Sequence, residues 1–98
     1  MTLTLKLNEG TKNVRAYEVL PGLYAHRTFV FGRDTWQLSH HSGLGVGCYA
    51  PTLKRIRAVA IATNGTIPMD WTQSAEEIQK QSDGANWLRE FHHHDCRI

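Results

Sequence analysis

Apolar and polar residues alternate at the start of this chain, and a period of two restricts such a segment to a β-strand. Leu3, Leu5 and Leu7 fall on one face of an extended stretch over residues 2–7. Later stretches are rich in β-branched and aromatic residues and are separated by turns such as Pro21-Gly22 and 32–34. These stretches cover residues 14–20, 23–31, 35–40 and 46–50. An antiparallel β-meander of four or five strands is predicted.

The period changes to that of helices after Pro51. Apolar residues from 53 to 63 recur three and four positions apart, which indicates a helix with one buried stripe, and Thr52 stands at its N-cap position. Asn64-Gly65 predicts that a residue in the left-handed conformation ends this helix, and a linker follows. We expect Cys48 to be a small core residue in the sheet that precedes this helix.

Two further short helices are expected near the C-terminus. Ser74 and Glu77 match a capping box at the start of a helix from about residue 75. An interruption at 82–84 precedes a short helix over 85–91, and a frayed polar end with three histidines follows. The fold class is therefore α+β: residues 1–98 form a single domain, with two or three short helices on one face of the meander.

Length and composition exclude several classes of protein. The chain has 98 residues and two cysteines, too few for a disulfide scaffold, and it lacks an apolar run of about 18 residues that could span a membrane. The alternating N-terminus differs from a signal peptide, which has a basic start and a continuous apolar stretch. We expect an intracellular, reduced protein with no membrane partner.

Charge is distributed unevenly along the chain. Residues 1–60 contain eight Lys and Arg against three Asp and Glu, whereas residues 61–98 contain three against six. The formal net charge of +2 conceals this asymmetry, which favours a charged macromolecular partner over a small substrate. The alternative is a solvated surface on which the two groups of charges interleave.

A basic cluster stands at the start of the helix that follows Pro51. Lys54, Arg55 and Arg57 oppose the helix dipole there, and an anion such as a phosphate backbone or an acidic protein surface would relieve them. The glycine-rich stretch 43–47 could let backbone amides approach that anion. The alternative is that the three side chains simply reach into water.

Basic residues also interleave with aromatic ones along the predicted sheet, an arrangement that suits stacking on single-stranded nucleic acid. The alternative is that these aromatics form the sheet core. The aromatic residues are Tyr17, Tyr24, Phe29, Phe31, Trp36 and Tyr49. The candidate partner-binding residues are Lys54, Arg55, Arg57, Arg33, Arg27 and Tyr49.

We expect neither a catalytic residue nor a metal or other cofactor. His92 and Cys96 share a helical face, but a structural zinc site needs four ligands. A Cys–His pair for nucleophilic catalysis could be imagined from Cys48 with His40 or with His26, but a lone thiol is usually a small core residue.

A series of residues in the middle of the chain resembles small accessory proteins of phages and other mobile elements. It comprises Trp36-x-Leu38-x-His40-x-x-Gly43-Leu44, then Thr52-Leu53-Lys54 with Ala58 and Ala60, then Asp70-Trp71. In size and style the chain is similar to anti-CRISPR proteins. That resemblance implies a noncatalytic inhibitor in the host cytoplasm that binds a CRISPR effector complex and obstructs target DNA or nuclease recruitment. The basic first part departs from the acidic pattern of DNA mimics. Oligomeric state stays open, and a small nucleic-acid-binding protein is the alternative function.

Overall fold

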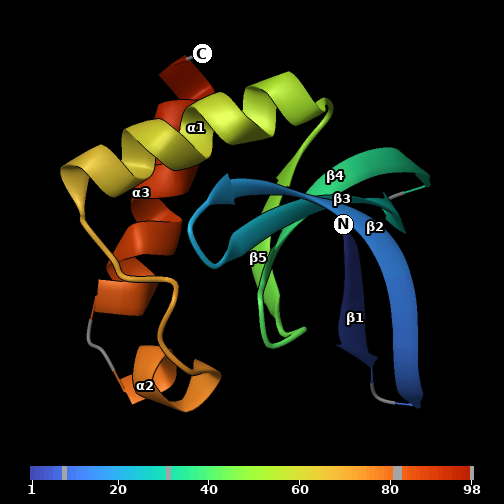
Figure 1. Ribbon diagram of the computed structural model, residues 1–98. Helices are drawn as coiled ribbons and strands as arrows, with labels where there is room; N and C mark the ends of the chain where they lie inside the picture. The colour runs from blue at the N-terminus through green and yellow to red at the C-terminus, as the bar shows by residue number, and fades with distance from the viewer. Residues whose placement is uncertain (8, 31, 81–82, 98) are drawn as a thin grey trace.

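The computed structural model describes residues 1–7, 9–30, 32–80 and 83–97, which form one five-stranded sheet and three helices (Figure 1). The strands are β1 (Thr2–Leu7), β2 (Gly10–Leu20), β3 (Leu23–Val30), β4 (Arg33–His40) and β5 (Gly45–Ala50). Each strand pairs antiparallel with the next, so the order in the sheet equals the order in the chain. The predicted antiparallel meander and the α+β class are confirmed.

Some strand boundaries differ from the predicted ones. β2 begins at Gly10 instead of residue 14, because Gly10 already pairs with Leu7 across the first turn. Arg33-Asp34, predicted as part of a turn, belongs to β4, and Arg33 pairs with Val30. The predicted last residue of the third strand, Phe31, lies outside the described residues. Backbone pairing extends these strands through polar positions that a hydrophobic pattern does not mark.

The sheet curls so that β1 meets the turn between β4 and β5. The backbone N–H of Lys6 donates to the carbonyl oxygen of Gly43 at 3.0 Å. Gly43 has a φ of +95°, and a Cβ at this position would overlap the carbonyl oxygen of Thr4. The face of the sheet that carries Leu3 is therefore enclosed, and Leu3 is buried.

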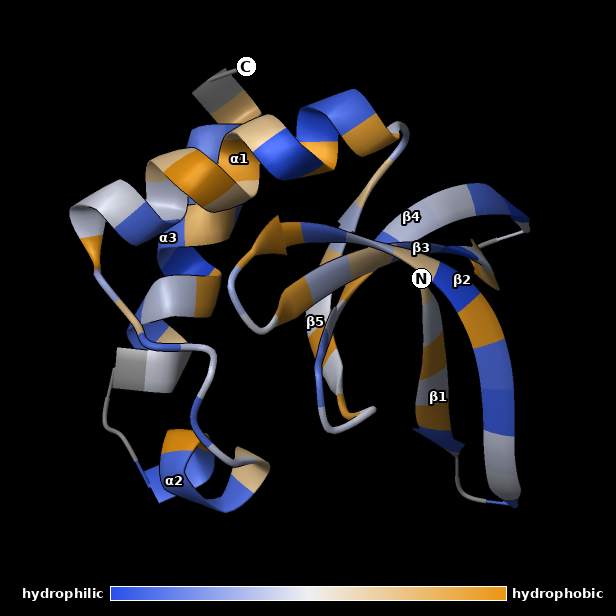
Figure 2. Ribbon diagram, viewed as in Figure 1, coloured by the Kyte–Doolittle hydropathy of each residue, from blue (hydrophilic) through white to orange (hydrophobic). Residues whose placement is uncertain are grey.

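Helix α1 (Leu53–Thr66) packs on the sheet, and helices α2 (Ala75–Lys80) and α3 (Asp83–Arg97) follow it. The hydroxyl of Thr52 accepts from the backbone N–H of Arg55 at 3.1 Å, which confirms the predicted N-cap. Hydrophobic and hydrophilic positions alternate along α1 in Figure 2, and its predicted stripe is buried. The buried residues of that stripe are Ile56, Val59, Ala60 and Thr63.

Helix α3 crosses α1 and lies beside α2 at its other end (Figure 1). Trp87 and Phe91 of α3 are fully buried, with their rings stacked 5.9 Å apart, and Trp71 meets Trp87 edge-on at 5.0 Å. These rings join the buried faces of β3, β4, β5 and α1 in one core. Trp87 and Phe91 therefore anchor α3 in the core.

The end of α3 differs from the prediction. The helix runs from Asp83 to Arg97 instead of 85–91, so the three histidines belong to a helix and the predicted frayed end is wrong. His94 contributes to this order because its Nε2 lies 3.2 Å from the hydroxyl oxygen of Thr66, at the end of α1, and 3.3 Å from a carboxylate oxygen of Glu90. Ser82, predicted as part of an interruption, lies outside the described residues.

Asn64 does not stop α1 as predicted. The helix continues to Thr66, and Gly65 is not left-handed. The Oδ1 atom of Asn64 instead accepts from the backbone N–H of Met69 at 3.2 Å, from Nε1–H of Trp71 at 3.3 Å and from Nε1–H of Trp87 at 3.2 Å. This one amide oxygen therefore joins α1, the segment before α2, and α3.

Among the described residues, the structure contains no helix long and apolar enough to cross a membrane.

Candidate binding surface

The six candidate residues from the sequence fall in separate places. Arg27 lies on β3, Lys54 and Arg57 are exposed in the first turns of α1, and Arg33 and Tyr49 line a hollow beside the end of β5. The glycine-rich stretch does not complete an anion site at the start of α1, since Gly43 packs against β1. The six candidate residues thus do not form one continuous surface.

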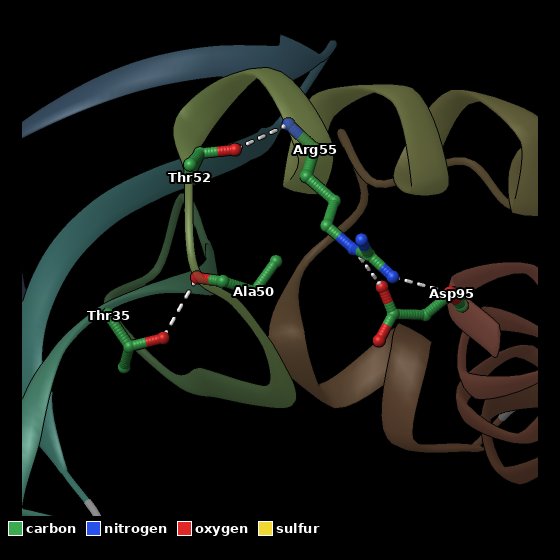
Figure 3. Close-up of polar contacts among 5 residues, drawn as sticks. All are labelled: Thr35, Ala50, Thr52, Arg55 and Asp95. Carbon is green, nitrogen blue, oxygen red and sulfur yellow. Dashed lines mark hydrogen bonds and ion pairs between the residues drawn. The ribbon is translucent and has the colours of Figure 1, made fainter. Parts of the chain in front are cut away.

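Arg55 is engaged within the fold. Its Nε–H donates to Oδ1 of Asp95 at 2.7 Å, and its Nη2–H donates to the carbonyl oxygen of Asp95 at 2.7 Å (Figure 3). The two residues are 40 positions apart, and their contact joins the first turns of α1 to the last turns of α3. Arg55 therefore serves to hold two helices together, and the candidate basic cluster is reduced to Lys54 and Arg57.

The hollow beside the end of β5 has mixed charge. It measures about 190 Å³ and is lined by Arg33, Thr35, Tyr49 and Asp95, among others. The hydroxyl of Thr35 donates to the carbonyl oxygen of Ala50 at 2.8 Å, as Figure 3 shows. Because Asp95 faces the same space as Arg33, an anion gains less there than beside cations alone.

Two arginines and two aromatic rings gather on the sheet instead. Arg15, Tyr17, Arg27 and Trp36 line a hollow of about 310 Å³ on β2, β3 and β4, and we call these four residues the arginine–aromatic patch. The guanidinium carbon of Arg27 lies 5.9 Å from the centre of the Trp36 ring, within the range of a cation–π contact. The rings of Tyr17 and Trp36 lie 5.9 Å apart at 58°.

Alternation along the strands places these side chains on one face. Arg27 pairs directly with Trp36, so both point to the same side of the sheet, and Phe29 follows two residues after Arg27. Phe29 is 68% exposed. Trp36, one of the aromatics for which the sequence left stacking and a core role open, is half-buried at the edge of the core, which leaves its ring available to Arg27.

The remaining sheet aromatics do not join this face. Tyr24 pairs with Ser39, and Tyr49 pairs with Gln37, which places both on the opposite side. The hydroxyl of Tyr24 donates to a carboxylate oxygen of Glu18 at 3.3 Å, and burial together with this carboxylate raises the pKa of Tyr24. The sequence pattern missed Arg15, although its alternation with Tyr17 along β2 was a usable signal.

Buried histidines are held by the fold. Nε2 of His26 lies 2.8 Å from the Ser39 hydroxyl, and Nδ1 lies 3.1 Å from the carbonyl oxygen of Arg27, so Nδ1 carries the proton and Nε2 accepts. Nε2–H of His40 donates to the carbonyl oxygen of Gln73 at 2.8 Å. Burial lowers the pKa of both imidazoles, which favours their neutral forms.

Cys48 is buried in the core as predicted, and burial raises the pKa of its thiol to about 12. A thiol that stays protonated at neutral pH is a poor nucleophile. We expect one thiol, that of the exposed Cys96, to react with an aromatic disulfide reagent in the folded protein at neutral pH, and both to react after denaturation. Two thiols reacting equally fast in the folded protein would contradict the burial of Cys48.

Within the parts of the chain that the structure describes, no group of three or more His, Cys, Asp and Glu side chains is placed to hold a metal ion. His92 and Cys96, the pair that shares a helical face in the sequence, are both exposed on α3.

The patch, with Phe29 beside it, is therefore the most distinctive surface of the described chain, because it combines unpaired cations with exposed aromatic area. Comparison with protein-family models, with curated proteins and with solved structures finds no match to this chain.

Proposed function

We propose that this protein is a noncatalytic inhibitor from a mobile element that binds a host CRISPR effector complex in the cytoplasm and covers a surface needed for target DNA or for nuclease recruitment. The resemblance to anti-CRISPR proteins supplies the kind of partner. The arginine–aromatic patch, with Phe29 beside it, supports a binding role. Trp, Tyr and Arg are the residue types that contribute most to protein interfaces, and here they are gathered on one face.

The exposed position of Phe29 gives the proposal its test. Phe29→Asp removes an apolar side chain that is 68% exposed, so the fold loses little buried area. It places a carboxylate beside the proposed interface, and repulsion from Asp34, which pairs with residue 29, costs about 0.2 to 1 kcal/mol. We expect purified effector complexes to capture the Phe29→Asp variant about tenfold more weakly than the original chain, and inhibition of target cleavage to fall in parallel.

Ile61→Asp is the matched control, because Ile61 is 51% exposed on α1, away from the patch. It should leave capture and inhibition unchanged. Equal weakening by both substitutions would show that the interface does not lie on this face of the sheet. Failure of the original chain to bind any effector complex would contradict the proposal.

A second candidate, binding of single-stranded nucleic acid, rests on the occurrence of cations and exposed aromatics on the same face. A salt titration of binding to oligonucleotides tests it. Neutralisation of phosphates makes the logarithm of the affinity fall linearly with the logarithm of the salt concentration. Absence of binding at low salt would exclude this candidate.

A further inference from the structure

Within the described chain, the two arginines of the patch lack an acidic partner. The ion pairs among the residues that the structure describes are Arg55 with Asp95, Lys80 with Glu76, and His94 with Glu90. Arg15 and Arg27 line the same hollow, so their like charges are held near each other. An anionic group between them would remove that repulsion.

Arg27 is also held in a position that suits recognition of a carboxylate. A guanidinium that lies over an aromatic ring keeps its N–H edge free, and this edge can donate two parallel hydrogen bonds to one carboxylate or phosphate. The contact with the Trp36 ring restricts the Arg27 side chain before a ligand arrives, so fewer conformations are lost on binding.

The same contacts do not favour stacking of nucleobases. The guanidinium of Arg27 lies over the Trp36 ring, and Tyr17 is inclined at 58° to that ring, so these two rings do not form parallel stacking surfaces. The hollow of about 310 Å³ has room for a few side chains. It is a local pocket for charged groups, whereas a single strand needs a groove that follows its backbone.

An apolar anchor lies beside the charged hollow. Phe29 and Arg27 are two residues apart on β3, which is about 7 Å along the strand. Asp34 pairs with Phe29 and faces the same side, so an acidic ligand would be repelled at that end and drawn toward the arginines. The arrangement fits an extended segment in which acidic residues precede or follow an aromatic one.

We propose that the arginine–aromatic patch binds an acidic segment of a partner protein, with carboxylates held by Arg15 and Arg27 and an apolar side chain packed on Phe29. This inference rests on the proposed function in so far as the patch is the surface that meets the partner, and it adds the chemistry that the partner must present.

The test uses the full chain and a fluorescein-labelled peptide of repeated Glu-Glu-Phe-Gly units, followed by fluorescence anisotropy. Replacing Arg15 and Arg27 together with Gln should weaken binding about tenfold or more, since both charge-assisted contacts are lost. Arg27→Lys keeps the charge but loses the planar fork, so it should give an intermediate loss.

Lys6→Gln with Lys12→Gln is the matched control, because it removes the same charge from exposed positions on the β1–β2 hairpin. It should leave binding nearly unchanged. Equal losses for the two double variants would show general charge attraction and overturn the proposal, as would equal binding of a peptide in which Gln replaces every Glu.

Two further measurements test whether the patch binds a different partner. Arginine-dependent binding of oligothymidylate, with none of the acidic peptide, would overturn the proposal in favour of nucleic acid. Self-association that Glu76→Gln with Glu77→Gln abolishes would overturn it in favour of a second copy of this chain. Inhibition of an effector without peptide binding would contradict this inference and leave the proposed function standing. Peptide binding without any effector interaction would contradict the proposed function and leave this inference standing.

Discussion

Replacing Asn64 with Leu is expected to lower the free energy of unfolding by about 2 to 4 kcal/mol, because three N–H groups lose their shared acceptor at once. Two of these donors are the indole groups of Trp71 and Trp87, and both side chains are buried. A buried donor without a partner costs about 1 to 3 kcal/mol, and water can reach the half-buried site only in part. Chemical denaturation followed by tryptophan fluorescence measures the loss.

Asn64→Asp is the matched control. It keeps an oxygen at the acceptor position but adds a negative charge near the C-terminal end of α1, which costs about 0.3 to 1 kcal/mol. The Asp variant should therefore be clearly more stable than the Leu variant. Equal losses in the two variants would mean that the shared oxygen contributes little to the free energy of unfolding, and that the shape of the Asn64 side chain accounts for the loss.

The amphipathic elements could be predicted from the sequence because their signals are local. A buried stripe in α1 and alternation in β1 depend on residues within one element, and both the meander and the α+β class follow from such patterns. The role of Asn64 depends on Trp71 and Trp87, which no local pattern connects to it. A turn signal of Asn followed by Gly was therefore mistaken for the end of a helix that continues to Thr66.

The candidate surface was partly predicted for the same reason. Alternation and composition identified Arg27 as a cation on the sheet, but pairing between β3 and β4 decides that Trp36 lies beneath it. The contact of Arg55 with Asp95 could not be predicted because the two residues are 40 positions apart, and α1 and α3 come together only in the folded chain. Charge counts along a sequence show which residues are available, and the fold decides which of them remain unpaired.

Gly22→Ala, in the turn between β2 and β3, should lower the free energy of unfolding by about 2 to 4 kcal/mol. Gly22 has a φ of +84°, which alone disfavours a side chain. A Cβ there would also overlap the backbone carbonyl of Trp71 and approach the backbone nitrogen of Thr72 to 2.8 Å. The turn has little freedom to withdraw, because the carbonyl oxygen of Gly22 accepts from the backbone N–H of His41 at 3.0 Å.

Gly32→Ala separates the two causes, since Gly32 has a similar φ of +75° and no atom of the described residues outside its own turn would lie within 4 Å of a Cβ there. It should cost about 1 to 2 kcal/mol, the conformational part alone. Because Gly22→Ala displaces the backbone of Trp71 and Asn64→Leu removes the partner of its indole, both act on one segment, and their losses should not add. A double-mutant cycle should show a coupling of more than about 0.5 kcal/mol between them, and none between Asn64→Leu and Gly32→Ala. Strict additivity in the first cycle would mean that the turn and the Asn64 contacts stabilise the segment before α2 independently.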